Sequence, residues 1–295
     1  MTSSLLRPRR RIHEDTVDRR VVAGSTAPTR ILDWPDRRVT ALAERAASTA
    51  SARHPESVEN PGKVENPVST EGTMNAQDPS IAGDAVRRVQ VLRTAHRLIA
   101  TAVRPVYSVQ DERPTSQVLR LGRGSCSQRL AVLEAVARAS GVATRVRGLL
   151  LDGAFWYPRF PHLRRIVPDQ VVLAWPEFHL TGPSTGEHPM AHWLTVAELF
   201  GNLDELSNGP GGGFTNTGPE TLFEALSRTA IDWDGTTLCP TTDARTACDL
   251  SGYVLADLGH FGSRDELFAR HGQTLCRVAR LVAEPVLGRH SAGAR

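Results

Sequence analysis

One cysteine at the start of a predicted helix constrains the fold of this chain more than any other feature. Apolar residues follow Gly124-Ser125-Cys126 at helical spacing as far as Ala139, and serine is a residue type that caps helix N-termini. We therefore expect Cys126 in the first turn of a helix. Unpaired backbone N–H groups and the positive end of the helix macrodipole stabilise a thiolate there, which suits a nucleophile.

The same cysteine also has a purely structural interpretation. Free cysteine is among the most frequently buried residue types, and a cysteine near a helix start is often a small core residue. The glycines Gly122 and Gly124 let a substrate backbone approach closely. Together with the cap and the basic residue Arg129, they favour a functional site over simple packing.

The composition is that of a globular protein without special demands on its partners. The chain has 295 residues, 40% hydrophobic content and a net charge of +3, which allows a sizeable core and requires neither nucleic acid nor membrane as partner. Lys63 is the only lysine, and this arginine bias indicates a GC-rich bacterial genome. No apolar run approaches the roughly 18 residues of a membrane span, and no secretory leader is evident.

Cysteine usage indicates the compartment. The four cysteines include no Cys-x-x-Cys pair, which argues against structural zinc. Without a secretory leader we expect free thiols in a reducing, cytoplasmic setting. We expect no metal and no cofactor.

The chain divides into three parts. Residues 1–80 are predicted to be a basic arm and a largely disordered linker, because arginines without apolar periodicity are followed by a stretch rich in Ser, Pro, Asn and Glu. Within this part, residues 31–34 could dock on the core and residues 36–49 could form a short helix. Residues 81–200 carry the periodic patterns of a folded core. Residues 201–295 are predicted to be a mostly helical extension.

The core pattern is helical first and extended afterwards. A helix is predicted over residues 84–103, followed by Tyr107 and the cysteine helix, and strands are predicted over residues 143–151, 171–180 and 192–199. A helix followed by an antiparallel meander is an α+β arrangement.

In the extension, two helix starts are predicted from capping patterns. Pro219 at a first turn begins a helix through Arg228. Ser263 and Glu266 form a capping box for a helix running past Cys276.

The order of these features resembles the transglutaminase-like superfamily of papain-type thiol enzymes. The pairing of Gly124-x-Cys126 at a helix start with the turn from Arg138 to Arg145 carries the resemblance, which covers residues 84–200. It implies a cysteine helix packed on an antiparallel sheet. It also implies a Cys-His-Asp triad for acyl transfer or amide hydrolysis, with the histidine at the start of the second strand.

The chain departs from the superfamily pattern at the histidine. The implied position holds Gln170, or Leu173 in an alternative register. His162, in the loop before that strand, is a candidate to supply an imidazole from an unconventional position. Gln170 is a candidate to polarise a carbonyl, since an amide cannot act as a general base near neutrality. The implied acid corresponds to Glu198 only in a shifted register.

Two functions remain open from the sequence. In the first, the protein is a thiol-dependent acyltransferase or amidase in which Cys126 attacks a peptide, amide or thioester and an amine or water resolves the acyl-enzyme. Thioesters are already activated and make fewer demands on a weak base. In the second, the protein is a catalytically inactive relative that binds a peptide or partner. His260 and His271 could serve the first function only by folding over the site.

Overall fold

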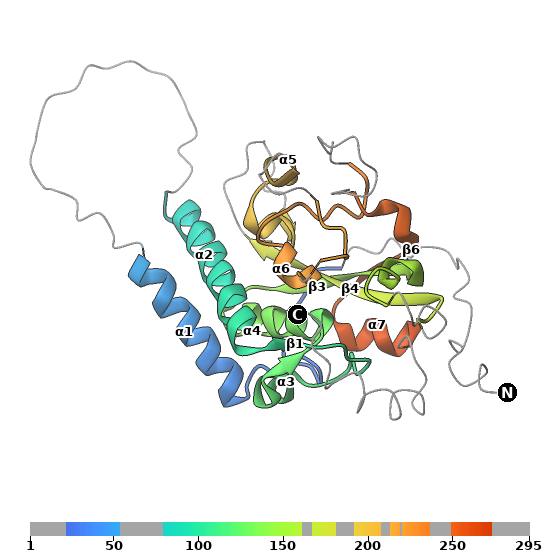
Figure 1. Ribbon diagram of the computed structural model, residues 1–295. Helices are drawn as coiled ribbons and strands as arrows, with labels where there is room; N and C mark the ends of the chain where they lie inside the picture. The colour runs from blue at the N-terminus through green and yellow to red at the C-terminus, as the bar shows by residue number, and fades with distance from the viewer. Residues whose placement is uncertain are drawn as a thin grey trace, which may run out of the picture.

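The structure is a computed structural model in which helices cover an antiparallel sheet (Figure 1). The described residues are 22–53, 79–160, 167–180, 192–207, 213–218, 220–236 and 249–272. His162 and three of the cysteines lie outside the described residues. The fold is therefore mixed, with an antiparallel sheet and several helices, as the α+β prediction requires.

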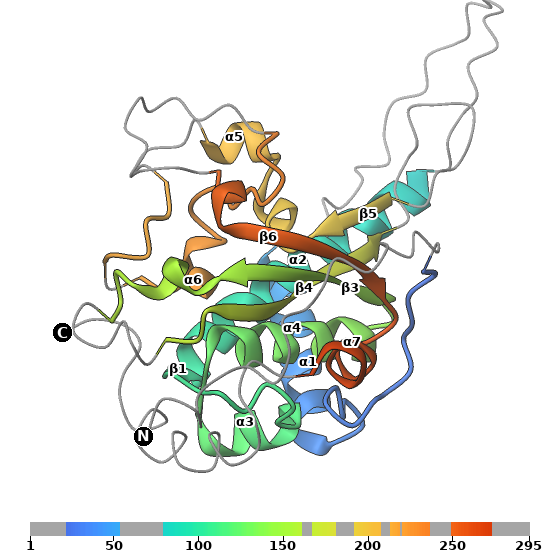
Figure 2. The same ribbon diagram turned by 90° about the vertical axis from the view of Figure 1, so that its right-hand side faces the viewer.

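The sheet of the described residues has four strands in the order β5-β4-β3-β6, with every neighbouring pair antiparallel (Figure 2). Its strands are β3 (Thr144–Asp152), β4 (Gln170–Leu180), β5 (His192–Thr195) and β6 (Val254–Phe261). The first two agree with the predicted strands. The third is shorter than predicted, because a turn after Thr195 leads into the 3₁₀ helix η2 (Glu198–Phe200).

Strand β6 corrects the prediction of a mostly helical extension. It lies at the edge of the sheet beside β3, so residues from the last third of the chain complete the sheet that carries the core. Its pairing shifts register at Gly148/Leu149 and at Leu150/Leu151, and Gly259 takes a positive φ of 84°. Such irregularities remove the strict alternation by which a strand is recognised in sequence.

The helices predicted in the extension are shorter than expected. Helix α7 (Arg264–His271) begins after Ser263, whose side chain accepts from the Glu266 N–H, and ends before Gly272, which has a positive φ of 76°. It therefore ends before Cys276, which lies outside the described residues. Helix α6 (Leu222–Ala225) is also a single short turn.

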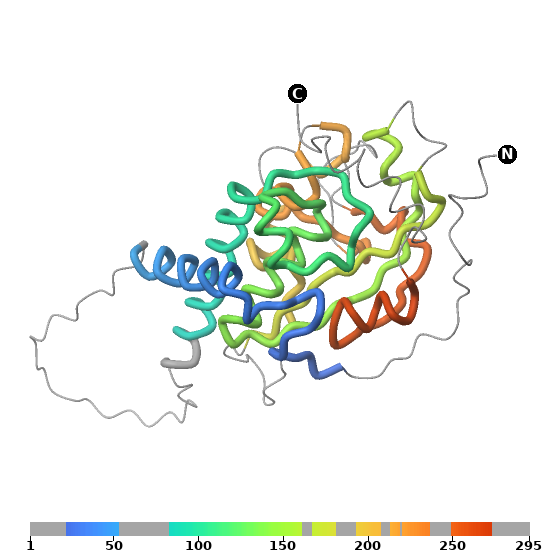
Figure 3. Tube along the Cα trace, turned by 90° about the horizontal axis from the view of Figure 1, so that it is seen from below, coloured from blue at the N-terminus to red at the C-terminus, as the bar shows by residue number. Residues whose placement is uncertain are grey.

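The helical layer includes part of the predicted arm. Helix α1 (Arg37–Arg53) packs against α2 (Pro79–Ala102) and α4 (Cys126–Ala139), as Figure 3 shows. Ile31 and Leu32 are fully buried in the same cluster. The docking expected of residues 31–34 and the helix expected over residues 36–49 are thus present. Residues 22–53 belong to the packed core rather than to a basic arm or disordered linker, because α1 buries an apolar face that includes Val39, Leu42 and Ala46.

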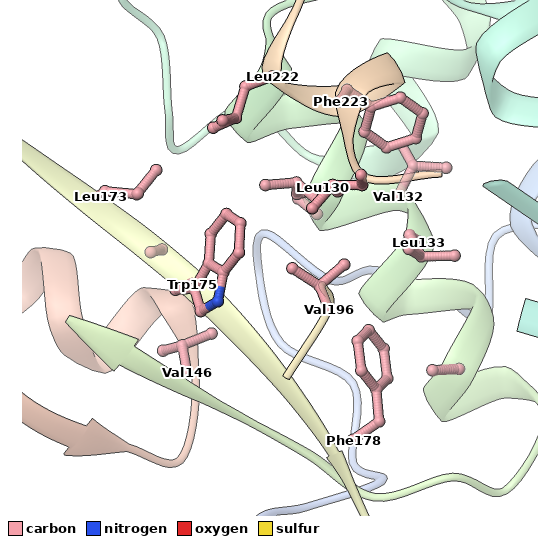
Figure 4. Packing of buried hydrophobic residues seen from close by; sticks show 14 of the residues in the cluster. Leu130, Val132, Leu133, Val146, Leu173, Trp175, Phe178, Val196, Leu222 and Phe223 are labelled. Atoms are coloured by element: carbon pink, nitrogen blue, oxygen red, sulfur yellow. The ribbon is translucent and has the colours of Figure 1, made fainter. Parts of the chain in front are cut away.

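Apolar side chains from α4 meet those of β4 in the centre of the core. Figure 4 shows Leu130 and Leu133 of α4 together with Trp175 and Phe178 of β4, all buried. The remaining elements are β1 (Arg104–Pro105), α3 (Thr115–Leu121), β2 (Arg123–Gly124), η1 (Gly153–Trp156), α5 (Leu203–Ser207) and η3 (Ser251–Tyr253).

A network of buried charges joins α4 to α7. Glu134 is fully buried, accepts from Arg264 Nε at 2.7 Å and lies 3.6 Å from an Arg138 nitrogen. Arg138 also donates to the Ala27 carbonyl at 2.7 Å. Arg264 extends to Ser127 Oγ at 3.4 Å in the first turn of α4. These contacts hold the N-terminal segment, α4 and α7 in one arrangement.

The connection between α4 and β3 decides which end of the sheet adjoins Cys126. A tight turn at Gly141, with a positive φ of 76°, reverses the chain after α4. The helix and the strand therefore run in opposite directions, and Cys126 lies towards the end where β3 stops at Asp152 and β4 starts at Gln170.

Candidate functional site

Cys126 is the first residue of α4, and Ser125 caps the helix as the sequence predicts. Ser125 Oγ accepts from the Gln128 N–H at 3.3 Å, and Gln128 Oε1 accepts from the Ser125 N–H at 3.0 Å. Within the described residues no hydrogen bond engages the backbone N–H of Cys126 or Ser127. Because these groups lie at the positive end of the helix, they are available to an oxygen anion next to the half-buried thiol.

Gln128 also holds a loop against the start of α4. Its side-chain N–H groups donate to Ser108 Oγ at 2.9 Å and to the Gln110 carbonyl at 2.8 Å. The preceding residues are fixed by the parallel pairing of β1 with β2, in which the Val106 N–H donates to the Gly124 carbonyl. These contacts place Tyr107 close enough to Cys126 for a negative charge on the thiol to act on the phenol.

Tyr107 is held as a neutral hydroxyl. Its ring packs on Phe160 with 4.5 Å between centroids, and its oxygen accepts a hydrogen bond from Arg159. Burial raises the pKa of Tyr107, and the charge of Cys126 raises it further, while Arg159 opposes both. Near neutrality the phenol therefore keeps its proton and can donate it in a hydrogen bond.

Arg159 is itself fixed by a separate segment. It donates to Asn216 Oδ1 at 2.7 Å and to the Glu220 carbonyl. Asn216, which has a positive φ of 57°, donates in turn to the Phe155 carbonyl at 2.6 Å. Sequence reasoning missed Arg159, because nothing local indicates which turn of the chain approaches Cys126. Tyr107 was visible only through its place between the first helix and the cysteine helix.

Gln170 lies at the end of the sheet nearest Cys126. It opens β4 opposite Asp152. Strand alternation puts its side chain on the same face as Ala174 and its partner Gly148, which is the face covered by α7. Within the described residues no hydrogen bond joins Gln170 to Cys126.

Glu198 has a structural partner. Its Oε2 accepts from the backbone N–H and from the hydroxyl of Thr195, each at 2.7 Å. The carboxylate therefore stabilises the turn after β5. In the part of the chain that the structure describes, it forms no hydrogen bond with a histidine.

The histidines of the extension do not fold over Cys126. His260 lies on β6 opposite Arg147, on the sheet face away from α7, where its Nε2 is 3.2 Å from Glu177 Oε1. His271 ends α7, and its ring packs against Phe261 with 5.5 Å between centroids. The remaining candidate, His162, lies outside the described residues.

The sequence indicated that Arg129 adds to the positive electrostatic field at the thiol. In the structure this arginine pairs with a carboxylate instead. Its side chain is fully buried, forms an ion pair with Glu224 and lies 4.2 Å from the centre of the Phe223 ring. Glu224 is the N3 residue of the α6 capping box. Arg129 therefore docks α6 on α4, and the balancing carboxylate cancels most of its charge.

His96 of α2 is a buried core histidine that sequence reasoning also missed. Its ring stacks on Phe223 with 4.3 Å between centroids, and its Nε2–H donates to the Phe223 carbonyl at 2.6 Å. Burial lowers its pKa from 6.5 to about 4, so the imidazole is neutral near pH 7.

Comparison of the chain with protein-family models, with curated proteins and with solved structures finds no match. Among the described residues, no helix is both long and apolar enough to cross a membrane. In the same ranges, no group of three or more His, Cys, Asp or Glu side chains is placed to hold a metal ion.

Proposed function

We propose that this protein is a transglutaminase-like acyltransferase or hydrolase that works through an acyl-enzyme on Cys126. The observation that supports this most is the thiol at the first position of α4, with the protonated hydroxyl of Tyr107 near enough for the charge of the thiol to act on it. A nucleophile, free helix N–H groups and a neutral donor are the components that acyl transfer requires at one place.

The chemistry follows from the positions of these groups. The Cys126 thiolate attacks an acyl carbon, and the carbonyl oxygen becomes an anion. The Cys126 N–H and the Tyr107 hydroxyl are the donors for this anion, and Arg159 fixes the hydroxyl by donating to its oxygen. Collapse of the intermediate expels the leaving group, and an amine or water later releases the acyl group from Cys126.

The lack of a general base beside Cys126 among the described residues favours an activated substrate. Among the described residues no imidazole contacts Cys126, and Gln170 cannot take up a proton near neutrality. A thioester needs little help, because its thiolate leaves without prior protonation. We therefore propose thioesters ahead of peptide amides as the acyl donors.

Acylation by a small thioester tests the function. Incubation with an acyl N-acetylcysteamine thioester should add one acyl group to Cys126, detected by intact mass and peptide mapping, and Cys126→Ala should abolish the adduct. Tyr107→Phe should slow acylation by about 10²-fold, because an oxyanion donor is lost while the ring packing on Phe160 remains. Tyr253→Phe is a matched control, since Tyr253 lies in η3 and its ring packs on Phe155 with 5.5 Å between centroids.

A binding protein is the second candidate, and the absence of a histidine at Gln170 favours it. In that case no thioester, activated ester or peptide amide acylates Cys126, and binding of a peptide is unchanged in Cys126→Ala. Gln170→His separates the two further. Restored turnover only in that variant would identify a lapsed enzyme, whereas an acyl adduct on the unaltered protein contradicts the binding role.

A further inference from the structure

Two arginines stand side by side just before the cysteine helix. Arg104 of β1 and Arg123 of β2 are Cα partners in a parallel pair, and partnered residues of neighbouring strands point to the same face. Gly124, the next residue, faces inwards, since a Cβ there would lie 2.9 Å from Val118 and 3.1 Å from Gln128. The guanidinium groups of Arg104 and Arg123 therefore project from the outer face.

Among the residues that the structure describes, no acidic side chain pairs with either of these two positive charges. Within the described ranges no ion pair or hydrogen bond engages the side chain of Arg104 or Arg123, whereas the side chains of Arg129, Arg145 and Arg147 each pair with a carboxylate. Like charges directly opposite each other on paired strands are unfavourable. A pair that breaks this rule is expected where a bound anion supplies the missing charge.

The position of the pair relates this anion to Cys126. Arg123 precedes Cys126 by three residues, so their Cα atoms are at most about 11 Å apart. The positive end of α4 lies at the same place. We propose that Arg104 and Arg123 bind a phosphate group of the acyl donor, and that the donor is an acyl thioester of a phosphate-bearing thiol such as phosphopantetheine.

The chemistry of arginine selects phosphate among anions. A guanidinium fork binds phosphate oxygens bidentately, and two forks can share one dianion, whereas a single carboxylate offers two oxygens and one charge. This inference rests on the proposed function, because the phosphate belongs to the substrate of Cys126. The transfer needs no further reactant: the Cys126 S–C bond forms, the donor S–C bond breaks, and the thiol proton of Cys126 ends on the departing thiolate.

Two donors with the same acyl group and different thiols test the proposal. Acyl-coenzyme A carries phosphate, and acyl N-acetylcysteamine does not. We expect the second-order rate of Cys126 acylation to be about tenfold higher or more for the phosphate-bearing donor, and the advantage to shrink with added salt. Arg104→Gln/Arg123→Gln should remove the advantage and leave the rate with N-acetylcysteamine thioester unchanged. Arg37→Gln/Arg45→Gln, on exposed positions of α1, should change neither rate.

The outcomes separate this inference from the proposed function. Equal rates for the two donors in the unaltered protein, or an advantage that survives in Arg104→Gln/Arg123→Gln, would overturn it. An acidic peptide thioester that loses as much in the double variant would reassign the pair to carboxylates and also overturn it. An acylated carrier protein reacting faster than acyl-coenzyme A would assign the phosphate to a protein-borne arm, and the reverse order would assign it to the free cofactor.

A direct binding arm applies even if no thioester acylates Cys126. Coenzyme A itself, titrated by calorimetry into the Cys126→Ala protein, should bind at least tenfold more weakly when Arg104 and Arg123 are both replaced by Gln. Binding that is absent, or equal in the two proteins, rejects the phosphate site.

Discussion

The two halves of α4 are stabilised by different kinds of contact. The second half carries Glu134 and Arg138, both fully or almost fully buried, and each is paired with charged or polar groups from other elements. The first turn carries Cys126, half-buried, and depends on neutral hydrogen bonds from Gln128 to a loop. The second half is thus fixed by buried charges, whereas in the first turn the buried charge of Arg129 pairs with Glu224 of α6 and neutral hydrogen bonds of Gln128 hold the loop near Cys126.

The difference shows why chemistry belongs at the first turn. Buried ion pairs are costly to break and hold one arrangement, which suits the joining of distant segments. A site that admits a substrate needs hydrogen-bond donors that are not already paired. It also needs neighbouring side chains that can be replaced without unfolding the protein. Variants in the two halves should therefore differ in what they damage.

Loss of Glu134 should have the largest effect on stability. Glu134→Ala leaves the buried guanidinium groups of Arg138 and Arg264 without their carboxylate, and we expect the free energy of unfolding to fall by about 3–5 kcal/mol. Glu112→Ala is the matched control, because its partner Arg30 is 70% exposed and such pairs contribute about 0–1 kcal/mol. Urea denaturation monitored by circular dichroism measures both. Similar losses in the two variants would contradict the large contribution assigned to the buried pairs of Glu134.

The stability of the fold should depend on pH through His96, which packs against Phe223 of α6. Its pKa is about 4 in the fold and 6.5 as an ordinary value, so the unfolded chain binds the extra proton between these values. Stability is full above about pH 6.5 and falls as the pH falls towards 4, by about 3 kcal/mol at most.

His96→Gln separates this histidine from the other groups that titrate in the same window. It keeps a donor towards the Phe223 carbonyl but cannot become charged. The slope of unfolding free energy against pH between 6.5 and 4 should therefore flatten in the variant. An unchanged slope would assign the pH dependence to other groups.

Local patterns were sufficient for most elements of the core but not for strand β6 or for the contacts between elements. The α4 start could be predicted because Ser125 and the following apolar spacing act within a few residues. Strand β6 could not, because two register shifts remove its alternation. The buried place of α1 was missed because its apolar face is interpretable only once α2 and α4 are known to adjoin it.

The candidate site divides in the same way. Cys126 and its cap are local features of one segment, so the sequence predicted their placement. Arg159 meets Tyr107 only because residues 213–218 and 220–236 bring Asn216 and Glu220 beside it. The expectation for Arg129 was wrong for a related reason, since the carboxylate that neutralises it lies 95 residues further along the chain at Glu224.

The smallest expected loss of stability comes from replacing Gln128 in the first turn of α4. The expected effect on the acylation rate of Cys126 is larger. Gln128→Ala removes the reciprocal cap and both hydrogen bonds to the loop of Tyr107, and we expect the free energy of unfolding to fall by about 1–2 kcal/mol. Because Tyr107 is then no longer held, acylation of Cys126 should slow by at least about tenfold. Gln117→Ala, on an exposed position of α3, is the matched control and should change neither quantity.

Measuring both quantities on the same samples distinguishes positioning from simple destabilisation. If acylation slows only through unfolding, Gln128→Ala and a variant of equal stability loss elsewhere, such as Thr29→Ala, which loses a hydrogen bond to Asp265, should be affected alike. If Gln128 positions Tyr107, Tyr107→Phe should slow acylation much less in the Gln128→Ala protein than in the unaltered protein. Full additivity of the two replacements would show that Gln128 caps α4 without organising the groups around Cys126.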